Sequence, residues 1–135
     1  TPTALVIGAG DGLGSAISQK FSREGLTICP VRRSLTKLTP LVNQIRSQNG
    51  TVHPFGVDCR DENAVIDLVT HVDETVGPID VTVFNIGANI KHDVLETTER
   101  KYRKVWDMAC HAGFLAAKES ARVMVPRRRG TIIFT

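Results

Sequence analysis

Short apolar runs alternate along the chain with longer segments in which apolar residues recur every three or four positions. The apolar runs predict five β-strands, at Thr3–Ile7, Leu26–Val31, Thr51–Val57, Ile79–Asn85 and Thr131–Thr135. The intervening segments predict helices at Gly12–Glu24, Ser34–Gln48, Asp61–Val76 and about Thr97–Val125. Nearly continuous apolar strands that alternate with helices indicate a parallel sheet with helices on both faces. We therefore expect a doubly wound, Rossmann-like α/β fold with strand order 3-2-1-4-5.

Glycines, prolines and capping residues are consistent with these boundaries. A glycine follows each predicted helix, at Gly25, Gly50, Gly77 and Gly130. Ser34 and Asp61 precede helices and are candidate N-caps. Proline lacks the N–H group that a strand needs for pairing, so Pro54 is acceptable only if the third strand lies at the sheet edge. The second strand, which contains Pro30, should be internal. We therefore expect Pro30 to lie at the exit of that second strand.

The composition describes one globular domain. The chain has 135 residues, of which 41% are hydrophobic and 23% charged, and its net charge of +3 suits an anionic ligand without indicating nucleic acid. The three cysteines, Cys29, Cys59 and Cys110, are scattered, and no signal peptide or membrane-spanning apolar run is present. We therefore expect a cytoplasmic protein with reduced thiols and no membrane partner. No histidine has ligand spacing, so no metal site is expected.

The loop between the first strand and the first helix is the main candidate binding site. Its residues are Gly8, Gly10, Asp11, Gly12, Leu13 and Gly14. Glycines let the backbone approach a phosphate, and the following helix N-terminus supplies free N–H groups and a positive dipole end. The glycines fit the spacing GxxxGxG, because Leu13 and Ser15 interrupt GxGxxG. Asp11 would repel a phosphate, and we expect its side chain to cap the helix instead.

The end of the second strand bears on the choice of cofactor. An NAD-binding protein usually has an acid there for the ribose hydroxyls, but no acid lies between Gly25 and Leu35. Arg32 and Arg33 follow the strand instead, and a guanidinium can bind a 2′-phosphate through paired hydrogen bonds. Ser34 either adds a hydroxyl to that site or caps the next helix. We therefore favour NADP(H) over NAD(H), the alternative being two solvated arginines.

Further motifs follow in a set order. Asp58 and Cys59 leave the third strand, Asn85, Ile86 and Gly87 leave the fourth, and the long helix carries Trp106–Phe114. In this order the chain resembles the short-chain dehydrogenase/reductase family from residue 3 to residue 135. The resemblance implies that Asp58 and the Cys59 backbone meet the adenine. It also implies that the turn at residues 85–87 supports the sheet beside the nicotinamide ribose.

The chain also departs from the family pattern. Ile7 precedes the glycine loop where the family usually has Thr, and Cys110 stands where the long helix usually contributes an active-site Asn. Cysteine cannot make the hydrogen bonds of that amide. The family's catalytic Ser and Tyr-x-x-x-Lys pair are expected beyond Thr135. The one tyrosine, Tyr102, is followed four residues later by Trp106, so we expect no catalytic residue within this chain.

The resemblance implies an NADP(H)-dependent oxidoreductase that transfers hydride between the nicotinamide and a small-molecule carbonyl or alcohol. Residues 1–135 would be its dinucleotide-binding domain, incomplete relative to the family. The alternative is a non-catalytic module that binds a dinucleotide or pairs with another subunit. A Ser and a Tyr-x-x-x-Lys pair after Thr135 would distinguish the two.

The apolar and small residues of the predicted helix at about Thr97–Val125 indicate that the protein associates with copies of itself. They are Tyr102, Val105, Trp106, Ala109, Gly113, Ala116, Ala117 and Ala121. These residues form more apolar surface than one face of the sheet can cover. The alternative is that all of them pack against the sheet. In the family this helix packs against its symmetry mate, so we expect a homodimer or homotetramer.

Overall fold

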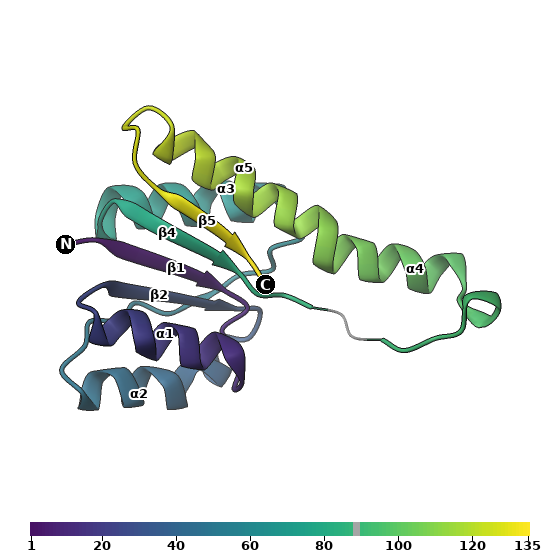
Figure 1. Cartoon of the computed structure of the whole chain (residues 1–135), viewed down its shortest axis with the longest axis horizontal. Coiled ribbons are helices and arrows are strands. Elements are labelled where there is room, and N and C mark those ends of the chain that lie inside the picture. The colour runs from purple at the N-terminus through teal and green to yellow at the C-terminus, as the bar shows by residue number, and fades with distance from the viewer. Residues whose placement is uncertain (88–89) are drawn as a thin grey trace.

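The computed structural model describes residues 1–87 and 90–135, and its centre is a five-stranded parallel sheet (Figure 1). The strands are β1 (Thr3–Ile7), β2 (Thr27–Arg32), β3 (Phe55–Gly56), β4 (Ile79–Phe84) and β5 (Thr131–Phe134). Their order is β3-β2-β1-β4-β5, and every pairing is parallel. The predicted doubly wound topology is confirmed.

Helices follow the strands along the chain. They are α1 (Leu13–Arg23), a 3-10 turn η1 (Leu35–Leu38), α2 (Thr39–Ser47), α3 (Glu62–His71), a π-helical turn η2 (Val72–Val76), a 3-10 turn η3 (Val94–Glu96), α4 (Glu99–Trp106), a π-helical turn η4 (Asp107–His111) and α5 (Ala112–Met124). α1 and α2 lie on one face of the sheet, and α3 and α5 on the other (Figure 1). None of the helices in the described ranges is long and apolar enough to cross a bilayer.

Two hydrophobic cores, one on each face, hold these layers together. In β1, Leu5 and Ile7 pack in the core with α3 and α5, and Ala4 and Val6 pack in the core with α2. The whole of β1 is buried. Burial on both faces is why the strand is apolar at successive positions from Ala4 to Ile7 instead of at every second one.

The two strand prolines have different outcomes. Pro54 lies next to the edge strand β3, as expected, but Pro30 lies inside β2, paired with Val6, so its predicted place at the strand exit is wrong. Ile28 bonds toward the β3 side, through Thr51 and His53. Because alternate residues of a strand face the same neighbour, Pro30 also faces that side. Pairing there is interrupted between residue 52 and Phe55, so the missing N–H leaves no ladder bond unmade.

The caps also differ in part from expectation. The Asp61 side chain accepts a hydrogen bond from the Ala64 N–H at 3.3 Å, which confirms that N-cap. Ser34 precedes η1 but makes no capping hydrogen bond. After α2 the left-handed residue is Asn49, with φ of 61°, instead of the predicted Gly50.

The long C-terminal helix is continuous from Glu99 to Met124, with the π-helical turn η4 in its middle. Two of its small residues, Gly113 and Ala116, are buried. A Cβ at Gly113 would lie 3.2 Å from the Phe134 ring and 3.3 Å from the Phe84 ring. These two positions therefore bring the helix close to the sheet and belong to the part of the helix surface that the sheet covers.

Candidate functional site

The glycine loop turns between β1 and α1 at the carboxyl edge of the sheet. A Cβ at Gly8 would lie 2.5 Å from the Asn85 carbonyl oxygen, and one at Gly14 would lie 2.2 Å from the Gly8 carbonyl oxygen. Gly8 also has a φ of +86°. These two glycines are needed for the turn itself. A Cβ at Gly10 or Gly12 would meet nothing within 4 Å, so this side of the loop is open to a ligand.

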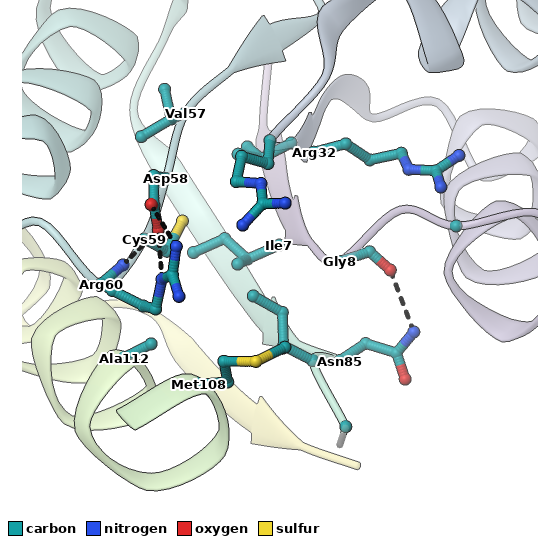
Figure 2. Close-up of a pocket in the computed structure, with 15 residues that line it drawn as sticks. Ile7, Gly8, Arg32, Val57, Asp58, Cys59, Arg60, Asn85, Met108 and Ala112 are labelled. Carbon is teal, nitrogen blue, oxygen red and sulfur yellow. Dashed lines mark hydrogen bonds and ion pairs between the residues drawn. The ribbon is translucent and has the colours of Figure 1, made fainter. Parts of the chain in front are cut away.

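A cleft of about 370 Å³ lies beside this loop (Figure 2). The predicted site residues that line it are Gly8, Gly10, Arg32, Arg33, Asp58, Cys59, Asn85, Ile86 and Gly87. Four strands contribute these residues at or just after their carboxyl ends, which is where parallel α/β sheets bind ligands. The predicted residues that do not line the cleft are Asp11, Gly12, Leu13, Gly14, Ser34 and Cys110.

Arg32, the last residue of β2, and Arg33, which follows it, both line the cleft. The Arg32 Nη1 lies 3.6 Å from the Asp11 carboxylate, on the side of the glycine loop, and 3.4 Å from the Lys37 carbonyl oxygen. The pKa of Asp58 is lowered chiefly by its hydrogen bonds with Arg60, and the charge of Arg33 adds to this lowering. Positive charge therefore faces both the glycine loop and the β3–α3 loop.

Asp11 does not cap α1, contrary to expectation. Gly12 is the N-cap residue and no side chain bonds to the first turn. The Asp11 side chain is 92% exposed and faces Arg32 instead. With a glycine as N-cap, no side chain occupies the first turn. The Ser15 N–H donates to the Gly10 carbonyl oxygen at 2.9 Å, which leaves the N–H groups before it for solvent or for an anionic ligand.

Asp58 forms the best-defined polar contact of the cleft, with Arg60 (Figure 2). The Arg60 Nε donates to Asp58 Oδ1 at 3.0 Å, its Nη2 donates to Oδ2 at 2.8 Å, and its backbone N–H donates to Oδ1 at 3.1 Å. These hydrogen bonds lower the pKa of Asp58 to about 2. Asp58 is therefore a fixed carboxylate at neutral pH. Arg60 is not among the site residues predicted from the sequence, although its position two residues after Asp58 is compatible with a local ion pair.

Asn85 ties together strand ends that lie far apart in the sequence. Its Nδ2 donates to the Gly8 carbonyl oxygen at 3.1 Å, and its Oδ1 accepts from the Thr135 hydroxyl at 2.6 Å. Its backbone N–H also donates to the Ile7 carbonyl oxygen at 2.8 Å. The side chain therefore holds the glycine loop against β4 and the end of β5 (Figure 2 shows the bond to Gly8).

The cysteines are not placed as reactive groups of the cleft. Cys59 lines the cleft but is buried, and burial raises the pKa of its thiol to about 12. The thiol therefore stays protonated, and Cys59 contributes to the cleft through its shape and backbone and not as a nucleophile. Cys110 is exposed and does not line the cleft. The long helix instead contributes Met108 and Ala112, which are not among the site residues predicted from the sequence. Their spacing of four residues was compatible with one helix face, but nothing in the sequence indicated which face meets the cleft.

Within residues 1–87 and 90–135 no group of His, Cys, Asp and Glu side chains could hold a metal ion.

Comparisons with known proteins agree with this geometry. Residues 2–135 match the model of the family described as short chain dehydrogenase. A short-chain dehydrogenase from Rhodopseudomonas palustris is 44% identical in sequence, with a TM-score of 0.91 over 98% of this chain and 62% of its own. A metagenomic short-chain oxidoreductase, solved in complex with NADP, is 25% identical, with a TM-score of 0.93 over 98% of this chain and 61% of its own.

A curated relative, short chain aldehyde dehydrogenase 1 of Euphorbia lathyris, is 31% identical over 98% of this chain and 46% of its own length. The chain spans about half the length of the curated relatives it matches, from 42% to 51%. The glycine loop, the strand order and the family match over residues 2–135 together lead to one conclusion: the chain belongs to the short-chain dehydrogenase family.

Proposed function

We propose that the whole protein is an NADP(H)-dependent oxidoreductase that acts on a small carbonyl or alcohol substrate, and that residues 1–135 supply its cofactor-binding part. The observation that carries the cofactor preference is the end of β2. Arg32 and Arg33 line the cleft there, and no acid lies between Gly25 and Leu35. The relative solved with NADP supports the same preference.

The residues present fit a dinucleotide. The open side of Gly10 and Gly12 admits a pyrophosphate, and the N-terminus of α1 directs free N–H groups toward it. Arg32, beside the glycine loop, would bind the 2′-phosphate. Asp58 would accept a hydrogen bond from the adenine amino group, because its carboxylate remains ionised beside Arg60.

The bound nicotinamide would supply hydride transfer to or from the substrate carbon. The contribution of residues 1–135 is binding and orientation. Asn85 fixes the glycine loop to the β4 end through Gly8, and Ile86 and Gly87 form the wall that follows β4. In the family, a Tyr-x-x-x-Lys pair exchanges the proton with the substrate oxygen and a Ser orients that oxygen. We assign neither of these functions to a residue in the range 1–135.

Titration calorimetry on the intact protein tests the cofactor preference. We expect NADPH to bind at least tenfold more tightly than NADH, about 1.4 kcal/mol, because one charge-assisted phosphate contact has this order of magnitude. Arg32→Ala should remove most of the difference, whereas Arg103→Ala, in an exposed ion pair on α4, should leave it unchanged. Equal affinities for NADPH and NADH in the unmodified protein would contradict the proposal.

Turnover assays separate the enzyme from the alternative module. The intact protein should oxidise NADPH in the presence of at least one member of a panel of aldehydes and ketones. Tight NADPH binding without any turnover across that panel would favour the non-catalytic dinucleotide-binding module.

A further inference from the structure

The Gly8 carbonyl oxygen is a fixed point of the glycine loop. It accepts a hydrogen bond from the Gly10 N–H at 2.9 Å and another from the Asn85 Nδ2 at 3.1 Å. A Cβ at Gly14 would lie 2.2 Å from the same oxygen, so the start of α1 packs directly against it. The position of this oxygen therefore sets the course of the loop between β1 and α1.

The amide of Asn85 can serve Gly8 in one orientation only. A carbonyl oxygen accepts hydrogen bonds and never donates them, so the NH₂ group must face Gly8 and Oδ1 must face away (Figure 2). The Thr135 hydroxyl lies 2.6 Å from that Oδ1 and 3.5 Å from the Phe84 carbonyl oxygen. The hydroxyl has one proton, and the shorter contact is the one it makes to Asn85.

Thr135 is itself held in place by the sheet. Its backbone N–H donates to the Phe84 carbonyl oxygen at 3.2 Å, which extends the pairing of β4 with β5 by one residue. The hydroxyl therefore approaches Asn85 from a fixed backbone. A hydrogen-bond donor in this place favours the amide orientation that Gly8 requires over the flipped one, which would set two oxygens against each other.

We propose that Thr135 is a positioning residue for the cofactor. Its hydroxyl orients the Asn85 amide, and the amide holds Gly8 and with it the glycine loop. This inference rests on the proposed function, because it takes that loop to be the pyrophosphate site. The pyrophosphate is common to NADPH and NADH, so Thr135 should affect the affinity for both dinucleotides equally, whereas Arg32 should affect that for NADPH.

The test is Thr135→Val in the intact protein, which removes the hydroxyl and keeps a β-branched side chain suited to a strand. Calorimetric titration should show NADPH and NADH both bound roughly three- to tenfold more weakly, the size of one lost hydrogen bond. Thr135→Ser, which keeps the hydroxyl, should bind both within about twofold of the unmodified protein. Adding Thr135→Val to Asn85→Ala should cause no further loss, because Thr135 acts through Asn85.

Thr131→Val is the matched control. It makes the same substitution on the same strand, but Thr131 begins β5 beside Val81, at the end of the sheet opposite the cleft. It should change neither affinity. Unchanged affinities in Thr135→Val, a loss for NADPH alone, a loss that serine does not rescue, or a further loss in the double variant would overturn the role of Thr135. Failure of the unmodified protein to bind either dinucleotide would instead overturn the proposed function.

Discussion

At the scale of single residues, the cleft is organised by charges whose partners are nearby in space. Asp58 is held by Arg60 through both of its carboxylate oxygens. Arg32 faces Asp11, and Arg33 adds its charge near Asp58. The cleft is therefore lined by three guanidinium groups and one carboxylate, an arrangement that suits a ligand with several phosphates.

The pKa of Asp58 provides a prediction at this scale. Arg60→Met removes the two side-chain hydrogen bonds and the charge that lower this pKa but keeps the bond from the backbone N–H, so the pKa should rise from about 2 toward the ordinary value of 3.8. A carboxyl group with a depressed pKa stabilises the fold above its unfolded pKa, and this contribution is lost as the pH falls through the folded pKa. The unmodified protein should therefore lose this contribution between about pH 4 and pH 2, and Arg60→Met should lack it.

The effect on the free energy of unfolding at pH 7 should be less than about 1 kcal/mol, because Asp58 is 39% and Arg60 30% exposed and solvent screens the pair. Carboxyl-resolved NMR titration measures the Asp58 pKa directly. Arg103→Met, which breaks the exposed pair with Glu99, is the control and should leave that pKa unchanged. An unaltered Asp58 pKa in Arg60→Met would show that Arg60 is not its cause.

At the scale of secondary-structure elements, the long C-terminal helix has two parts with different surroundings. In α5, Gly113 and Ala116 are buried against the sheet. In α4 no residue is buried, and Tyr102 and Trp106 are 63% and 46% exposed. Figure 1 shows α4 extending beyond the end of the sheet. Exposed aromatic side chains on a projecting helix are typical of an interface.

We therefore expect the intact protein to be a homodimer or homotetramer that associates through this helix. Ala117 is half-buried on α5, beside the exposed Phe114. Ala117→Arg should lower the oligomer mass measured by light scattering, because it adds a long charged side chain to a surface of small residues. Lys37→Arg, outside the helix, serves as the control. A monomer in the unmodified sample, or an oligomer that tolerates the arginine, would count against this interface.

At the scale of the whole molecule, residues 1–135 form a five-stranded parallel sheet with a cleft at its carboxyl edge. The described cleft is lined by the glycine loop, the β2 and β4 ends, the β3–α3 loop and the long helix. The one tyrosine of the chain, Tyr102, is exposed on α4 and does not line the cleft. Binding groups are therefore present without an acid–base pair of the family type.

The polypeptide of residues 1–135 alone should accordingly show no carbonyl reduction above background. Without a general acid to protonate the developing alkoxide, the reaction loses a contribution of about 10²- to 10⁴-fold, and the residues that orient the carbonyl are also lacking. Spectrophotometric NADPH oxidation with an aldehyde and ketone panel measures this, with the intact protein alongside. Turnover by the purified 1–135 polypeptide would refute the prediction.

Much of the fold and part of the site could be predicted from the sequence. Successive side chains of a strand point to opposite faces of the sheet, so a strand that is apolar at successive positions must be buried on both faces. Such strands are typical of a parallel sheet covered by helices. Given that sheet, the groups that follow β1, β2 and β4 must meet at its carboxyl edge. Gly8, Arg32 and Asn85 could therefore be placed around one cleft before any contact was known.

Only the tertiary structure decided which side chains face one another. Asn85 bonds to Gly8 across 77 positions of sequence, Pro30 is tolerated because its neighbouring strand is interrupted, and Met108 reaches the cleft because the helix packs with that face inward. Asp11 was assigned to a helix cap on local grounds, but in the fold it faces Arg32. The physical reason is general: periodicity specifies which positions are buried, whereas contact between distant segments depends on how the buried faces pack together.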